Sequence, residues 1–144
     1  MKKIILLMLS VIILSCQEDS NTLPATNYTI EGKWIYPSDT QGISASGFSN
    51  TMYLYEDGIR YTYYCTDGTE CESLYDSYQA GDGNHIPGTN NYTVENGVLT
   101  IDLNFGNVFV SPITFECEGG ILSFQDPNST ERSDLIRLNS GCDL

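Results

Sequence analysis

The chain has 144 residues and a formal net charge of −13, from 19 acidic and 6 basic side chains. This length suits a single domain with a core of its own. Such an acidic surface repels nucleic acid and anionic lipid headgroups, so we expect no nucleic acid partner and no membrane contact made through charge.

The N-terminus begins with two lysines after the first methionine, continues with an apolar run over residues 4–14 and reaches a cysteine at position 16. The apolar run is shorter than the ~20 residues of a membrane-spanning helix and fits the core of a secretory signal peptide. Its end, Ile13-Leu14-Ser15-Cys16, resembles the lipobox of bacterial lipoproteins. The resemblance implies that residues 1–15 are a signal peptide and that Cys16 carries a lipid anchor in the bacterial cell envelope.

Residues 16–27 are polar, show no periodicity and contain Pro24, so we expect a flexible tether between the lipid and the folded domain. Gln17 after the lipidated cysteine resembles the signal that favours the outer membrane over retention in the inner membrane. Glu18-Asp19 resembles the acidic stretch that sends some lipoproteins to the cell surface. The predicted location is therefore the outer membrane, with surface exposure as a further expectation.

From residue 28 onward, no segment places apolar residues at helical spacing over three turns, so we expect no long helix. Alternation and turn signals predict eight strands, over residues 29–36, 51–56, 59–65, 91–95, 98–105, 108–117, 121–125 and 134–139. Pro112 interrupts the sixth strand and predicts a bulge or bend, because proline cannot donate to the strand ladder.

Three connections carry two-residue hairpin signals, namely Asp57-Gly58, Asn96-Gly97 and Gly119-Gly120. In an up-and-down meander every second connection lies at the same end, so these turns close one end. The long polar linkers then lie at the other end, where only the connection at Gly106-Asn107 is tight. We therefore expect an all-β fold, an eight-stranded antiparallel up-and-down barrel over residues 28–144.

The order of short motifs points to a family. The first strand contains Gly32-Lys33-Trp34, an aromatic-rich strand with an E-D-G turn ends at residue 58, and a Y-x-V-x-x-G-x-L-x-I hairpin spans residues 92–101. In this order they resemble the lipocalins, and more closely the lipocalin-like domains of bacterial envelope lipoproteins, over residues 28–139. The resemblance implies a lipocalin-like barrel.

The lipocalin resemblance also implies how the barrel closes. The family places a basic residue of the last strand across the tryptophan of the first, and Arg137 is the matching residue for Trp34, beside Gly32. A guanidinium over an indole contributes about 1 kcal/mol. The role that the resemblance implies for this pair is to close the barrel and not to bind a ligand. Pro37 follows Trp34 closely, so we expect a short first strand.

Four cysteines remain beside Cys16, an even number in a chain that we expect in an oxidising envelope: Cys65, Cys71, Cys117 and Cys142. Their spacing does not match a zinc knuckle, so disulfides are the better interpretation. In the predicted meander Cys65 lies at the loop end, whereas Cys117 and Cys142 lie at the tight-turn end. A disulfide needs Cα atoms within about 7 Å, so we favour the pairs Cys65–Cys71 and Cys117–Cys142.

The chain carries no nucleophile, zinc-protease or phosphate-loop motif, so we expect no enzymatic activity and no cofactor. We interpret His85, which has no identifiable catalytic partner, as an exposed loop residue. The linker 66–90 is rich in carboxylates of the kind that calcium prefers: Asp67, Glu70, Glu72, Asp76 and Asp82. Because Asp82-Gly83-Asn84 lacks the later ligands of a calcium loop, we expect a solvated acidic loop, with calcium binding as the open alternative.

The chain has ten tyrosines, whose apolar rings and polar tips suit both binding faces and ordinary strands. Tyr53, Tyr55, Tyr61 and Tyr63 are the candidate ligand contacts, although the sequence does not decide which face of residues 51–56 points inward. The first hypothesis is a non-enzymatic protein that binds a small, partly apolar ligand at the loop end. The alternative is a barrel filled by its own side chains, a structural or protein-interaction module that contacts another envelope protein. An interior cavity of roughly a few hundred Å³ distinguishes the two.

Overall fold

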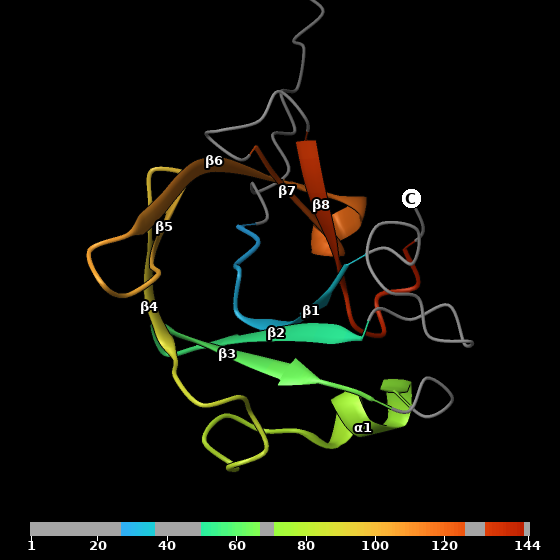
Figure 1. Ribbon diagram of the computed structural model, residues 1–144. Coiled ribbons are helices and arrows are strands. Elements are labelled where there is room, and N and C mark those ends of the chain that lie inside the picture. Colours follow the sequence, from blue (N-terminus) through green and yellow to red (C-terminus); the bar gives the residue numbers. More distant parts are fainter. Residues whose placement is uncertain (1–26, 37–49, 67–70, 126–131, 143–144) are drawn as a thin grey trace, which may run out of the picture.

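The computed structural model describes residues 27–36, 50–66, 71–125 and 132–142, and within them eight strands form a closed antiparallel barrel (Figure 1). Each strand pairs with its neighbours in sequence, and β1 pairs with β8 to close the ring. The predicted all-β, eight-stranded up-and-down barrel is therefore confirmed. The strands are β1 (Gly32–Ile35), β2 (Thr51–Glu56), β3 (Ile59–Tyr64), β4 (Asn90–Glu95), β5 (Val98–Asp102), β6 (Val108–Glu116), β7 (Ile121–Gln125) and β8 (Arg132–Arg137).

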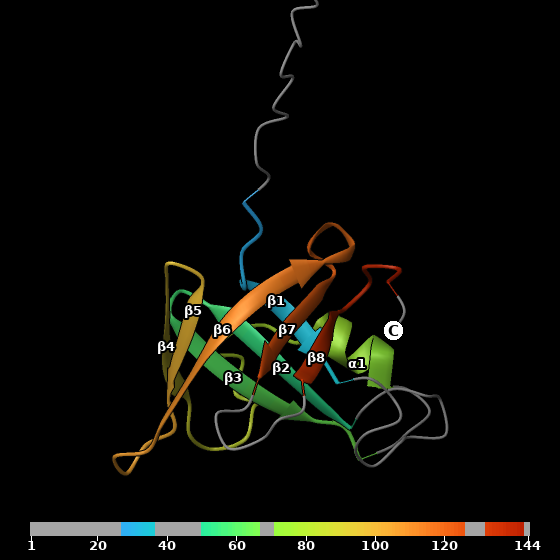
Figure 2. The same ribbon diagram turned by 90° about the horizontal axis from the view of Figure 1, so that it is seen from above.

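Two of the predicted tight turns are found at one end of the barrel. Asp57 and Gly58 have φ values of 50° and 77°, and Asn96 and Gly97 repeat this geometry with 52° and 76°. Two successive positive φ values match the twist of the flanking strands, which is why Asp-Gly and Asn-Gly occupy such turns. Figure 2 shows both turns at the end where residues 27–31 join the barrel, with the β5–β6 loop at the opposite end. We call these the tight-turn end and the loop end.

The β6–β7 connection is not the two-residue turn predicted at Gly119-Gly120. A short 3-10 turn, η1 (Cys117–Gly119), follows β6 instead. Both glycines allow close approach of other segments: a Cβ on Gly119 would collide with the Tyr28 ring, and one on Gly120 with the Cys142 sulfur. The two glycines are therefore needed for close packing against the N-terminal and C-terminal segments, and not for a tight hairpin.

Two predicted strands are shorter than expected by three residues or more. β1 begins at Gly32 rather than at residue 29, and the carbonyl oxygens of Thr29 and Glu31 accept hydrogen bonds from the Arg137 side chain. β5 ends at residue 102, because the next residues form a loop in which Phe105 has a φ of 54°. In the first case the contact with Arg137, and in the second a loop, takes the place of the strand pairing that the alternating pattern predicted.

The predicted irregularity at Pro112 is a change of partner. β6 pairs with β5 as far as Pro112, and from Ile113 onward it pairs with β7. The Ser111 hydroxyl, fully buried beside this point, accepts a hydrogen bond from the Gln125 backbone N–H at 3.0 Å. The ribbon of β6 is accordingly long and bent (Figure 1).

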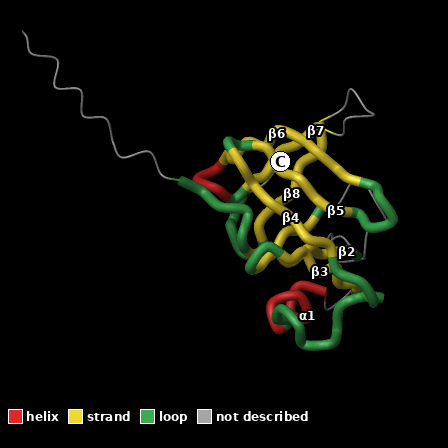
Figure 3. The backbone as a smooth tube through the Cα atoms, turned by 90° about the vertical axis from the view of Figure 1, so that its left-hand side faces the viewer, coloured by secondary structure: helices red, strands yellow, loops and turns green. Residues whose placement is uncertain are grey.

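A short helix that the sequence did not predict covers part of the outside of the barrel. Helix α1 (Cys71–Ser77) lies beside β2 and β3 and outside the ring of strands (Figure 3). Its buried Cys71 and Tyr75 join a cluster that includes Met52, Leu54 and Tyr63 on the outer faces of those strands. The barrel therefore has a second, external core on this side, and β2 and β3 are covered on both faces.

The interior forms the main core. At the tight-turn end it is filled, with Trp34 fully buried and its ring centroid 6.3 Å from that of Phe115. Tyr28 extends the contact, with its ring 6.2 Å from that of Phe115. The other interior residues of this core include Leu99, Ile101, Leu122 and Leu135.

Both predicted disulfides are present. Cys65–Cys71, which we call the loop disulfide, joins the end of β3 to the start of α1 with Cα atoms 5.5 Å apart. Cys117–Cys142, the tail disulfide, joins η1 to the C-terminal segment with Cα atoms 6.3 Å apart. The pairing inferred from opposite ends of the meander is confirmed. The predicted signal peptide, Cys16 and nearly all of the tether lie outside the described residues, and no helix among those described is long and apolar enough to cross a membrane.

Candidate functional site

Arg137 closes the barrel at the tight-turn end, in the place that the lipocalin resemblance implies. Its guanidinium carbon lies 4.3 Å from the centroid of the Trp34 ring. Its three nitrogens donate to the carbonyl oxygens of Gly119, Glu31 and Thr29, at 3.0, 2.6 and 2.7 Å. Loss of water around the guanidinium lowers the pKa of Arg137 from its ordinary value. This side chain therefore ties η1 and the segment before β1 to the last strand.

Gly32 makes this closure possible. Its φ of 122° lies in the region that favours glycine, and a Cβ at this position would lie 2.6 Å from an Arg137 terminal nitrogen. The glycine of the G-x-W motif therefore serves the arginine contact. Trp34 completes the arrangement by donating its indole N–H to the Ile30 carbonyl at 2.6 Å.

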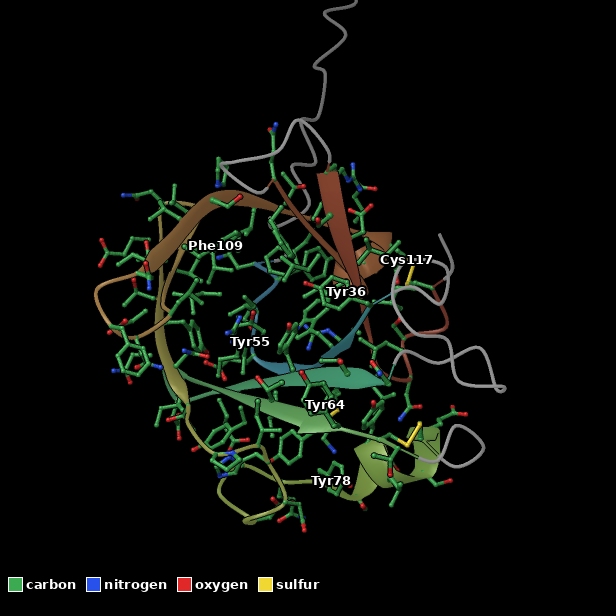
Figure 4. All side chains as sticks on the ribbon, in the orientation of Figure 1. Tyr36, Tyr55, Tyr64, Tyr78, Phe109 and Cys117 are labelled. Carbon is green, nitrogen blue, oxygen red and sulfur yellow. A yellow bond between two sulfur atoms is a disulfide. The ribbon has the colours of Figure 1, made fainter. Side chains whose placement is uncertain are left out.

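Above this filled region the barrel contains a cavity of about 210 Å³. We call it the loop-end cavity, because most of its wall comes from the strand ends next to the long loops. Five aromatic residues line it, namely Tyr36, Tyr53, Tyr55, Phe109 and Phe124. Four aliphatic residues, Leu99, Ile101, Leu103 and Leu135, and two polar ones, Arg60 and Ser133, complete the wall. Figure 4 shows Tyr36, Tyr55 and Phe109 within the ring of strands.

The tyrosines of the wall are held in apolar surroundings. Burial raises the pKa of Tyr55 to about 12, even though the neighbouring Arg60 lowers it. Burial, together with the nearby Tyr53, raises the pKa of Tyr36 well above its usual range. The rings of Tyr36 and Tyr53 meet edge to face at 5.8 Å. The cavity wall is therefore largely apolar, and the hydroxyls of Tyr36 and Tyr55 in it are neutral.

Arg60 is the one cationic side chain that the described part of the chain contributes to this wall. One terminal nitrogen donates to the Asn90 side-chain oxygen at 2.7 Å, and the guanidinium carbon lies 4.8 Å from the centroid of the Tyr53 ring. Its Nε atom is buried and has no hydrogen-bond partner among the described residues. Within the same residues, no carboxylate lies within ion-pairing distance of Arg60, and the ion pairs are those of Arg132. The site thus holds a half-buried positive charge without a counter-charge.

Arg60 also lies at one of the two shortest strand pairings of the barrel, the other being that of β1 with β8. β3 and β4 share only the pairs Ile59↔Asn91 and Arg60↔Asn90. Beyond this point the loop after α1 follows β3, and the Ile86 backbone N–H donates to the Thr62 carbonyl at 2.9 Å. The contact between Arg60 and Asn90 therefore joins the two strands where the regular ladder ends.

The structure separates the four candidate tyrosines into two pairs. Tyr53 and Tyr55 line the loop-end cavity. Tyr61 and Tyr63, the other two candidate ligand contacts, do not line this cavity and belong instead to the outer cluster under α1. Tyr63 stacks on the ring of Tyr78 at 4.7 Å and donates to the Gln79 carbonyl at 2.7 Å. The helix that was not predicted is the reason, since it buries the outer face of β3.

Comparisons with protein-family models, with curated proteins and with solved structures found no match for this chain. The lipocalin-like family therefore stays a prediction from the motifs, and the functional argument depends on the site itself.

The acidic linker is structured where it is described. Asp82 accepts hydrogen bonds from the backbone N–H groups of Gln79 and Asn84, at 3.0 and 2.8 Å. Burial alone would raise the pKa of Asp82, but these bonds outweigh it and the pKa is lowered. Asp76 accepts a hydrogen bond from the Asn139 side chain at 3.0 Å. Asp67 and Glu70 lie outside the described residues, and in the described part no three His, Cys, Asp or Glu side chains could together hold a metal ion.

His85 is half-buried, not the exposed loop residue expected from the sequence. Its ring meets Tyr61 edge to face at 5.2 Å, and its Nδ1 lies 2.8 Å from the Ile86 carbonyl. It therefore packs in the outer layer, away from the loop-end cavity.

A second depression lies at the tight-turn end, with a volume of about 440 Å³. It is bounded by residues 28–31, the β2–β3 turn at Gly58, part of β4 and Phe115. The Tyr92 hydroxyl donates to the Glu31 carboxylate across it, and burial together with this carboxylate raises the pKa of Tyr92. The described residues of its wall include an acidic group, Glu31, and no cationic side chain.

Proposed function

We propose that the protein is a lipid-anchored lipoprotein of the bacterial envelope whose barrel binds a small, partly apolar molecule without catalysing a reaction. The observation that carries the proposal is the loop-end cavity of about 210 Å³, with a wall of aromatic and aliphatic side chains and a few polar groups. Binding sites for small molecules have this composition. A barrel of eight strands is just wide enough to hold one small ligand.

The anchoring part of the proposal is supported by the sequence and by the disulfides. The N-terminal segment ends at Cys16 in a lipobox-like sequence, and two disulfides suit an oxidising compartment. Residues 27–31 enter the barrel at the tight-turn end (Figure 2). An anchor at Cys16 would therefore leave the mouth of the cavity at the end of the barrel that is opposite to the attachment.

A cavity-filling substitution tests the binding proposal. Ser133 is half-buried in the cavity wall, so Ser133→Phe places a ring inside the cavity. Thr114→Phe adds the same ring at an exposed position on β6 and is the matched control. A panel of small aromatic and aliphatic molecules is screened against the full chain in lipid nanodiscs by ligand-observed NMR, with empty nanodiscs as the blank. We expect Thr114→Phe to retain the hits of the unsubstituted chain and Ser133→Phe to lose them; hits that both variants retain contradict the proposal.

One observation favours the alternative, a protein-interaction module. The loop between β5 and β6 carries Phe105, which is fully exposed at 101%, and Val108 and Val110 on β6 are exposed at 56% and 47%. Exposed apolar side chains grouped in this way are typical of interaction sites. A photo-cross-linking residue at position 105 in the host cell would capture a partner protein if this alternative holds. The same cross-linker at the exposed Glu95, at the tight-turn end, is the control.

A further inference from the structure

We infer that the loop-end cavity selects a small monocarboxylate, an aromatic or short-chain acid, which places its carboxylate beside Arg60 and its apolar part against the aromatic wall. The inference deepens the proposed function and depends on it, because it assigns a chemical class to the ligand of the same cavity. It is carried by a charged side chain in an apolar wall, together with the volume of the cavity.

Arg60 brings a positive charge into the wall of the cavity. A guanidinium cannot lose its proton in a protein, so Arg60 stays cationic in the wall. Its polar contacts among the described residues are with neutral groups: the Asn90 side-chain oxygen at 2.7 Å, the Tyr55 hydroxyl, and the Tyr53 ring at 4.8 Å. A buried charge is unfavourable unless it is paired. An anion in the cavity would supply the counter-charge that the described residues do not provide.

The N–H donors of the Arg60 guanidinium are only partly used by the described residues. Arg60 Nε–H is buried and has no acceptor among the described residues, while one terminal nitrogen is already committed to Asn90. A guanidinium has five N–H donors arranged for the two oxygens of a carboxylate. Arg60 therefore keeps unused donors on the side chain that borders the cavity.

The number of charges in the wall limits the ligand to one negative charge. Among the described residues, Arg60 is the only Lys or Arg that lines the cavity, and the whole chain carries a net charge of −13. The field of such a protein disfavours anions in general and multiply charged anions most strongly. A carboxylate fits one guanidinium, whereas a dianionic phosphate ester would keep an unpaired charge inside the barrel.

The volume limits the size of the ligand. A cavity of about 150 Å³ with apolar walls is large enough to bind benzene. The loop-end cavity, at about 210 Å³, therefore has room for one ring or a short chain with a carboxylate, and not for a long acyl chain. The five aromatic rings around it favour a flat apolar group.

The test compares an acid with its neutral analogue. Phenylacetate and phenethyl alcohol differ in the carboxylate and have nearly the same size, and both are titrated by calorimetry into the full chain in lipid nanodiscs. Since a charge-assisted hydrogen bond adds about 1.5–3 kcal/mol, we expect phenylacetate to bind at least about ten-fold more tightly than the alcohol. Arg60→Gln should weaken phenylacetate to the level of the alcohol and leave the alcohol unchanged. Arg132→Gln, at an exposed arginine on β8, should change neither.

Each other outcome has a defined meaning. Equal binding of acid and alcohol, or acid binding that Arg60→Gln does not change, overturns the inference and leaves the proposed function intact. Acid binding that survives Ser133→Phe shows an anion on the surface and overturns the inference too. If neither molecule binds, the inference is wrong, and the proposed function is decided separately by the wider panel and its two phenylalanine variants. If Arg60→Gln does not fold, the acid–alcohol ratio in the unsubstituted chain and the Ser133→Phe variant decide alone.

Discussion

Arg137→Met should destabilise the barrel far more than the same substitution at Arg132. Arg137 donates three hydrogen bonds to backbone carbonyls, and its guanidinium lies 4.3 Å from the Trp34 ring. The bond to Gly119 is partly buried, whereas the other two are exposed to water and contribute less. Together with the cation–π contact, we expect a loss of about 3–4 kcal/mol in the free energy of unfolding. Methionine keeps most of the apolar stem, so the loss reports the guanidinium itself.

Arg132→Met is the matched control on the same strand. Arg132 pairs with Glu116 at 2.9 Å and with Asp134 at 2.6 Å, but its side chain is 49% exposed. Exposed ion pairs contribute little to stability, so we expect little change. Urea unfolding of both variants, followed by the fluorescence of the single tryptophan and by circular dichroism, measures the difference. Equal losses for the two arginines would refute the reasoning that Arg137 closes the barrel.

Three further predictions concern other parts of the structure, and urea unfolding measures each. Ser111→Ala removes a fully buried hydroxyl that accepts a hydrogen bond from the Gln125 backbone N–H, and should lower the free energy of unfolding by about 1–3 kcal/mol. Ser123→Ala should leave it nearly unchanged, because the Ser123 hydroxyl has no hydrogen-bond partner among the described residues. Replacing both cysteines of the tail disulfide by alanine should cost about 3.5 kcal/mol, because this disulfide closes a loop of 25 residues. The same replacement at the loop disulfide should cost about 2 kcal/mol, because its loop has 6 residues, and equal costs would contradict this reasoning. Burial raises the pKa of Tyr55 to about 12, so its contribution to stability is complete below pH ~10, where unfolded tyrosine is still neutral. Roughly 3 kcal/mol is lost as the pH rises through about 12. Tyr55→Phe should show less alkaline destabilisation than the unsubstituted chain, and an identical pH profile would argue against this shift.

The topology could be predicted because it depends on local signals. Asp57-Gly58 and Asn96-Gly97 accept positive φ at both positions, and they are found in the turns expected from this property. The alternation of these turns with long linkers was enough to place Cys65 and Cys117 at opposite ends, and hence to pair the cysteines correctly. Gly119-Gly120 failed as a turn signal because a glycine can also serve a close tertiary contact, which no local pattern reveals.

The candidate site was only half predictable, because α1 was missed. Cys71, Leu74, Tyr75 and Tyr78 follow helical spacing, but only over two turns, less than the three turns used as a criterion. Without this helix, the alternate residues of β3 that include Tyr61 and Tyr63 would be expected to face the barrel interior. Because α1 and the following loop cover that set from outside, Tyr61 and Tyr63 face out, and the alternate residue Arg60 faces the cavity. A charge in the barrel interior could thus be found only from the three-dimensional structure.

Native mass spectrometry of the full chain, isolated from its own host cell, is the most direct test of a ligand in the loop-end cavity. If the barrel binds a small molecule there, the protein should carry a non-covalent adduct that is released on unfolding and that Thr114→Phe retains. Ser133→Phe, which fills the cavity, should lose the adduct while keeping both disulfides and its β-sheet circular dichroism. An adduct of equal abundance in both variants, or a bare protein mass in the unsubstituted chain, would contradict the account.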